Sequence, residues 1–289
     1  MIVICFYSFF AYNNISMEKI DQSFFCENEF LSFLENANGR KEFIQKMLNE
    51  NGLDAPILQM NDKNHIYVNF PKEEYSKNKS IKTIIAHYDI FPGSPGANDN
   101  SFAVYCILKW AIWLHKNYQN SQAQHNVRVI FTDGEECGEN GVKSQGAFAL
   151  AKVFKKLKIL NDDIFVFDCM GRGDIPCICD CAIFFQSNSL FGKKYMVLEQ
   201  KACNAISKIT NGNCFKIKSN YSDNASFLAN GIPAICITML PFDELQKYMS
   251  FNEIPYTWKI LHTKDDNYLN ITEKSIQLMV LLLDELYKM

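Results

Sequence analysis

Short apolar runs that end at histidine or acidic residues recur along this chain, and they restrict the folds that it can adopt. The clearest runs are Ile84–Ala86, Val127–Phe131 and Ile164–Phe167. Longer stretches with apolar residues at helical spacing separate them, which is typical of an α/β protein with a largely parallel sheet. We therefore expect a mixed, largely parallel β-sheet with helices on both faces.

The residues that follow these runs predict a site at one edge of the sheet. His87 follows the first run, Glu135 and Glu136 come shortly after the second, and Asp168 follows the third. In open α/β sheets, ligands bind beyond the carboxyl ends of the strands. Oxygen donors and imidazoles delivered from separate strand ends are what a two-zinc hydrolase needs. Further along the chain, Asp223 and His262 continue the series.

Asp89 is a candidate partner of His87. The two residues are two positions apart at a strand end, so their side chains can point the same way. The Asp89 carboxylate could then accept a proton from the ring nitrogen of His87 that does not bind metal.

Asp99 lies in a turn after Gly96 and just before a predicted helix over about residues 101–116. A carboxylate in such a turn can bridge two cations with one oxygen on each. Aspartate is also a preferred residue at a helix N-cap, and the turn alone does not separate the two roles.

Glu135 and Glu136 are adjacent like charges. Their proximity is costly unless a metal neutralises one and the other holds a proton or a water. Adjacent acids are also common on solvated loops, but the position directly after a predicted strand favours a site.

Taken together, these segments resemble the M28 family of zinc-dependent exopeptidases, the aminopeptidase group with two zinc ions. The similarity extends from about Thr83 to the C-terminal helix. The segments that carry it are His87–Asp89, Gly96–Asn100, Gly134–Gly141, Phe167–Asp174, Ser222–Asp223 with Gly231–Pro233, and His262–Asp266.

The resemblance implies a role for each site residue and a zinc-dependent exopeptidase-like, phosphorylase/hydrolase-like fold. His87 and Asp168 would bind one of two zinc ions, Glu136 and His262 the other, and Asp99 would bridge them, with a cis peptide after it. Glu135 would be the general base, and Asp89 and Asp266 would support the two histidines. Asp223 resembles a supporting acid near the site and not a ligand.

The implied activity is that of a metallo-aminopeptidase acting on peptides with a free N-terminus. One alternative is a carboxypeptidase, deacylase or aminopeptidase of the related M20 and M42 types, in which longer insertions separate the equivalents of His87 and Asp99. Another is a catalytically inactive binding module on the same scaffold, which predicts that ligands are lost. A glutaminyl cyclase, with the same fold and one zinc, is disfavoured because ligands for two are present.

Composition bounds the remaining expectations. A net charge of −3 over 289 residues does not indicate a basic surface that would bind nucleic acid, and no stable membrane association is expected. Eleven cysteines without paired spacing indicate a reducing compartment, hence a cytoplasmic location, although the apolar residues 1–12 leave export open. We expect residues 1–16 to be an over-extended gene start or a weak signal segment. Residues 17–289 should form one zinc-exopeptidase catalytic domain. The sequence does not indicate an oligomeric state.

Overall fold

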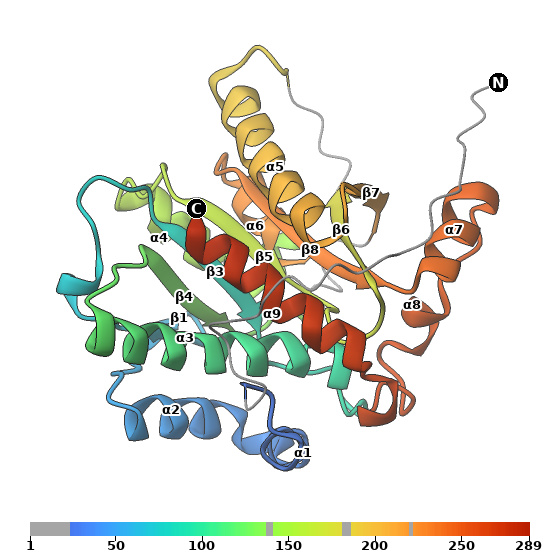
Figure 1. Ribbon diagram of the computed structural model, residues 1–289, viewed down its shortest axis with the longest axis horizontal. Coiled ribbons are helices and arrows are strands. Elements are labelled where there is room, and N and C mark those ends of the chain that lie inside the picture. Colours follow the sequence, from blue (N-terminus) through green and yellow to red (C-terminus); the bar gives the residue numbers. More distant parts are fainter. Residues whose placement is uncertain (1–23, 137–140, 181–185, 220–221) are drawn as a thin grey trace.

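The computed structural model describes residues 24–136, 141–180, 186–219 and 222–289, so the expected start segment lies outside it. The described strands form one sheet of eight (Figure 1). Across the sheet they are β1 (Ile57–Met60), β2 (Lys63–Val68), β4 (Val127–Thr132), β3 (Lys82–His87), β5 (Asp163–Phe167), β8 (Ala234–Leu240), β6 (Ile175–Asp180) and β7 (Phe215–Lys218).

The four central strands, β4, β3, β5 and β8, run parallel, and they include the three apolar runs of the sequence. On one side β2 and β1 are antiparallel additions; on the other, β6 is antiparallel to β8 and β7 is parallel to β6. The predicted mixed, largely parallel sheet is therefore confirmed. Its parallel centre brings the carboxyl ends of four strands to one edge.

Helices cover both faces of this sheet, as predicted. One face packs against α3 (Phe102–Ser121), α5 (Leu190–Ile209) and α9 (Glu273–Lys288), and the other against α4 (Gly146–Lys156) and α6 (Asp223–Ala229). The N-terminal helices α1 (Glu27–Glu35) and α2 (Arg40–Glu50) lie outside α3, and α7 (Phe242–Phe251) and α8 (Tyr256–Ile260) project from the end of β8 (Figure 1).

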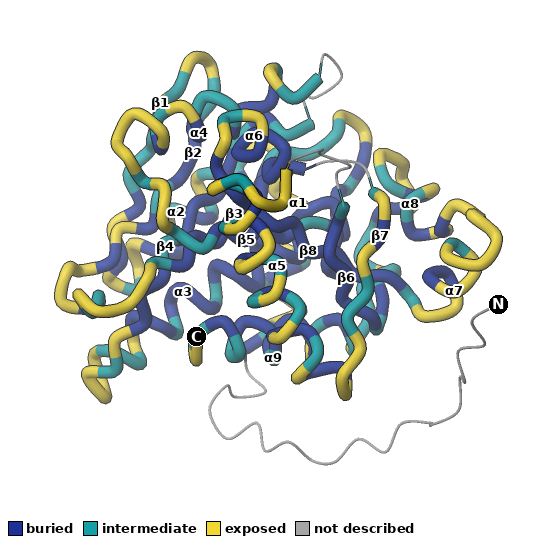
Figure 2. The backbone as a smooth tube through the Cα atoms, turned by 90° about the horizontal axis from the view of Figure 1, so that it is seen from above, coloured by how far each residue is buried: buried dark blue, intermediate teal, exposed yellow. Residues whose placement is uncertain are grey.

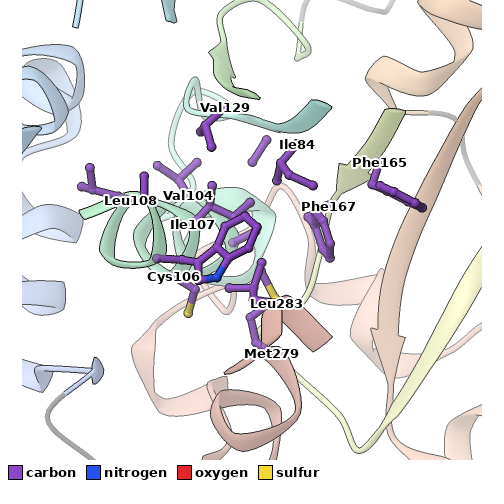
Figure 3. Packing of buried hydrophobic residues seen from close by; sticks show 14 of the residues in the cluster. Ile84, Val104, Cys106, Ile107, Leu108, Val129, Phe165, Phe167, Met279 and Leu283 are labelled. Carbon is purple, nitrogen blue, oxygen red and sulfur yellow. The ribbon is translucent and has the colours of Figure 1, made fainter. Parts of the chain in front are cut away.

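Alternation along the central strands decides which face each side chain enters. In β3, Ile84 joins the cluster under α3 and α9, whereas its neighbour Ile85 joins the cluster under α4 and α6. Figure 3 shows Ile84 and Phe167 packed with Ile107 of α3 and Leu283 of α9. Burial on both faces explains why these runs are almost continuously apolar, with Arg128 as the exception (Figure 2).

The elements that the sequence did not reveal are short or peripheral. β1 and β7 have four residues each, and β7 has a single buried residue, so neither presents a clear apolar period. The C-terminal helix begins where predicted, since the Thr272 hydroxyl accepts a hydrogen bond from the Ser275 amide at 3.1 Å. None of the helices in the described ranges combines the length and apolar character that crossing a membrane requires.

Three polar residues outside the candidate site, Glu74, His115 and His125, form a buried cluster away from the carboxyl edge of the sheet. The fully buried Glu74 carboxylate contacts His115 Nδ1 at 2.5 Å and His125 Nε2 at 2.9 Å. His125 Nδ1 accepts the Val127 amide, so its Nε2 must carry the proton that Glu74 accepts. The cluster ties the segment after β2 to α3 and β4, so His115 and His125 have a structural role.

Glu74→Gln should lower the free energy of unfolding by about 1–3 kcal/mol, because a neutral amide replaces the carboxylate that contacts both imidazoles in a buried site. Urea denaturation measures the effect. Glu73→Gln is the matched control, since its side chain is exposed, and it should leave the unfolding free energy nearly unchanged. Equal stabilities for the two variants would show that the cluster contributes nothing.

Candidate metal centre

Five residues from separate segments converge at the carboxyl edge of the parallel strands. They are His87 at the end of β3, Asp99 in the turn before α3, Glu136 after β4, Asp168 after β5 and His262 after α8. The chain brings together all five residues to which the sequence assigned metal. Convergence follows from topology, because β4, β3 and β5 are parallel neighbours whose ends coincide.

Asp99 stands between two groups of ligand atoms. Its Oδ1 lies 3.2 Å from His87 Nε2, and its Oδ2 lies 3.3 Å from His262 Nε2. Asp168 Oδ1 is 3.6 Å from His87 Nε2, and Glu136 Oε2 is 3.0 Å from His262 Nε2. The residues thus divide into His87 with Asp168 and His262 with Glu136, each pair sharing Asp99.

The donor set and its unsatisfied atoms fit metal binding. Among the buried side-chain atoms in the described ranges, His87 Nε2, Glu136 Oε1 and Asp168 Oδ1 have no hydrogen-bond partner. Buried polar atoms are normally paired, so three orphaned donor atoms in one place indicate a missing partner. Imidazole and carboxylate are ordinary zinc ligands, and ligand atoms of His87, Asp99 and Glu136 lie within 4.8 Å of one another, so the two groups are close enough to bind adjacent ions.

The electrostatics of the centre also favour cations. The pKa of His262 is raised to about 10 by hydrogen bonds to Asp99 and Glu136. Burial alone would lower the pKa of His87, but Asp168, Asp89 and Asp99 raise it well above its usual range. Burial likewise acts to raise the pKa of Asp99, yet its bonds to His262 and His87 bring it below the usual range. The carboxylates thus create a negative potential that retains protons on the imidazoles and would attract metal ions in their place.

Asp89 is placed beside His87, although its contacts differ from the expected ones. His87 Nδ1 lies 3.2 Å from the backbone oxygen of Asp89, and the nearer carboxylate oxygen is 3.6 Å away. The Asp89 carboxylate accepts the backbone amides of Glu135 and Glu136 at 3.2 and 3.1 Å. Asp89 therefore joins the loop of the acidic pair to the end of β3.

The expected support of His262 by Asp266 is wrong. Asp266 is buried and accepts the amides of Asn98 and Asp99 at 2.7 and 3.0 Å, which fixes the turn that presents Asp99. His262 instead stacks on Phe91, with ring centroids 4.4 Å apart and planes 6° from parallel. Nothing in the sequence spacing singled out Phe91.

The turn before α3 has the form that the resemblance implied. The Asp99–Asn100 peptide is cis, and Asn100 Nδ2 donates to the Phe167 carbonyl at 2.8 Å. Gly96 has φ +62°, and a Cβ there would come within 2.5 Å of Ile90, so the start of the turn requires glycine. Asp99 is therefore held by contacts with β5 and with the loop that carries Asp266.

Glu135 lines a cavity of about 450 Å³, and four of the candidate metal ligands, Asp99, Glu136, Asp168 and His262, line it too. Burial and the surrounding carboxylates raise the pKa of Glu135 well above its usual range, although His87 opposes them. Apolar and thiol side chains complete the wall: Phe91, Trp258, Leu261, Cys169, Cys179 and Cys236. Cys179 belongs to β6 and faces this cavity.

Asp223 lies behind the centre and not within the ligand group. It is fully buried at the start of α6, and its Oδ2 accepts the hydroxyl of Thr132 at the end of β4. Burial raises its pKa to about 7, against the opposing effects of His87 and Thr132. Its position agrees with the expected supporting role.

Comparison with known proteins gives a family and a set of similar folds. The model of peptidase family M28 matches residues 66–286. The solved aminopeptidase from Aneurinibacillus sp. strain AM-1 is 18% identical, with 78% of this chain and 47% of that chain aligned and a TM-score of 0.52. This chain thus spans about half the length of that aminopeptidase. No curated protein matched the sequence.

Two further structures align over nearly their whole length. Glutaminyl cyclase from Porphyromonas gingivalis is 17% identical, with 91% of this chain and 99% of that chain aligned and a TM-score of 0.63. A leucine aminopeptidase precursor from Bacteroides thetaiotaomicron is 14% identical, with 90% and 96% aligned and a TM-score of 0.62. At these identities the similarity establishes the fold.

Titration of the purified chain with zinc should give two bound ions and a higher melting temperature. A ligand at a hundred times its dissociation constant adds about 2.7 kcal/mol to stability. Asp99→Asn keeps the size of the side chain and removes the shared charge, so both sites should weaken by about 10–100-fold or more. Calorimetry and metal analysis measure this, with Asp54→Asn as a distant control. Undiminished binding of two ions by Asp99→Asn would contradict the shared position of Asp99.

Proposed function

The chain belongs to peptidase family M28, and from this premise we propose that it is an aminopeptidase that uses two zinc ions to release N-terminal residues from peptides. The observation that carries the proposal is the position of Asp99, with one oxygen toward His87 and the other toward His262. A carboxylate shared in this way suits two adjacent cations. Membership of this family itself supports a hydrolase that acts on peptides.

The residues present would hold the two ions as the sequence implied. His87, Asp168 and Asp99 would hold one, and His262, Glu136 and Asp99 the other. When bound, the ions would polarise the scissile carbonyl and increase the acidity of a nearby water. Both protonated imidazoles would first have to lose their protons, so metal binding should release protons to solvent.

Glu135 would act as the general base. It borders the cavity beside the metal ligands, and its raised pKa brings it closer to neutral pH, where a base works best. It would take a proton from the attacking water and return it to the leaving amine. The carboxyl therefore ends each cycle ionised, ready for the next substrate.

The charge of the cavity favours a peptide amino terminus over a carboxyl terminus. Asp99, Glu135, Glu136 and Asp168 all line it, and among the described lining residues none is a lysine or arginine that could pair with a substrate carboxylate. Phe91, Trp258 and Leu261 offer apolar surface to the first side chain. The family alternatives with an inserted domain or lost ligands gain no support, because eleven residues separate His87 from Asp99 and no ligand is missing.

A second candidate is a glutaminyl cyclase, because the same fold occurs in such enzymes. The Porphyromonas gingivalis cyclase aligns over nearly the whole of both chains, and so does the leucine aminopeptidase precursor from Bacteroides thetaiotaomicron, so the fold supports either reaction. Cyclisation needs the same free N-terminus but no attacking water, since the α-amine attacks the glutamine side chain and ammonia leaves. The two reactions therefore give different products from one substrate.

A panel of peptides should distinguish them, with an N-terminal leucine, alanine or glutamine on a common sequence. We expect release of the first residue in added zinc, detected by mass spectrometry. Glu135→Gln should bind zinc as the wild type does and lose about 10²–10⁴-fold in kcat, because it cannot accept a proton.

Glu50→Gln, an exposed site on α2, is the control and should keep full activity. Loss of 17 mass units from the glutamine peptide alone, with no residue released from any peptide, would replace the aminopeptidase with the cyclase.

A further inference from the structure

Gln145 contacts the proposed base, Glu135, and both residues line the cavity. Gln145 is 3% exposed at the start of α4, and its Nε2 donates a hydrogen bond to Glu135 Oε1 at 2.8 Å. Its own Oε1 accepts a hydrogen bond from the Ser226 hydroxyl, also at 2.8 Å. Ser226 lies on α6 and is fully buried.

The chemistry of these three groups fixes the orientation of the amide. An ionised carboxylate only accepts hydrogen bonds, so the nitrogen of the Gln145 amide must face Glu135. Its oxygen then faces Ser226, whose hydroxyl can donate. The three side chains form one chain of hydrogen bonds with each donor matched to an acceptor, which a buried polar network requires.

From this geometry we infer that Gln145 is a positioning residue for Glu135 and that Ser226 holds Gln145 in place. The inference rests on the proposed function, in which Glu135 is the base. Asp89 fixes the backbone of Glu135 through its amide, and Gln145 fixes the carboxyl end through Oε1. With both ends held, Oε2 is left for the attacking water.

A neutral amide suits this role better than a charged side chain. A lysine or arginine at residue 145 would form an ion pair with Glu135 and add positive charge beside the residues that would hold the metal ions. The amide restricts the carboxylate to one orientation without adding charge to the cavity. A base held in the reactive geometry contributes to kcat, because orientation matters for proton transfer and little for binding.

The test compares Gln145→Leu and Ser226→Ala with Gln45→Leu. Gln45 is a matched control, since its Nε2 also donates a single 2.8 Å hydrogen bond, to the Ala55 carbonyl far from the cavity. Gln145→Leu should lower kcat about 10–100-fold, as loss of supporting contacts commonly does, with KM and zinc content within twofold of the wild type. Ser226→Ala should lower kcat about 3–10-fold, and Gln45→Leu should leave it unchanged.

A readout independent of turnover is the crystal structure of Gln145→Leu, in which the Glu135 carboxylate should leave its wild-type orientation. An unchanged kcat, or an unchanged Glu135 carboxylate, would overturn the inference. A reduced melting temperature together with a lower kcat, a raised KM and a lower zinc content would also overturn it, by showing a merely structural role.

Failure of the proposed function gives a different result. If Glu135→Gln retained full activity, Glu135 would not be the base, whatever Gln145 did. If Glu135→Gln were inactive and Gln145→Leu fully active, the base would stand and only the positioning role would fall.

Discussion

The contacts of Asp99 with two histidines are the constraint on which the rest of the centre depends. A single carboxylate faces His87 with one oxygen and His262 with the other, although these histidines lie 175 positions apart in the chain. Asp168 lies beside His87, and Glu136 lies beside His262. Holding so many carboxylates together is electrostatically costly, and positive charge must offset it, whether from protons on the imidazoles or from metal ions.

Much of the scaffold serves to hold this arrangement. Asp266 fixes the turn of Asp99, Asp89 fixes the loop of Glu135 and Glu136, and Phe91 stacks on His262. Arg40 of α2, which precedes the matched family region, is 2% exposed and donates to the carbonyls of Tyr88 and Pro95. It thereby holds both ends of the segment that connects His87 with Asp99. Burial lowers its pKa to about 10 despite the opposing effect of Asp89, so it stays charged near neutral pH.

The sequence predicts the strands that carry the site and the residues at their ends. β3, β4 and β5 are largely apolar because helices cover both of their faces, and this makes them visible without an alignment. Short strands such as β7 are half-exposed and have no period to detect. Contacts between distant segments are equally hidden: Gln145 and Ser226 are ordinary polar residues in the sequence, and only the packing of α4 against α6 brings them to Glu135. The contact of Asp266 with His262 is expected from the family resemblance, but Asp266 instead accepts the amides of Asn98 and Asp99.

Anomalous diffraction at the zinc edge, from crystals grown with zinc, tests the central claim most directly. The account predicts two peaks about 3.5–4 Å apart, one on each side of the Asp99 carboxylate. One peak should lie within bonding distance of His87 and Asp168, and the other within bonding distance of Glu136 and His262. A single peak at full occupancy, or two peaks that do not share Asp99, would contradict it.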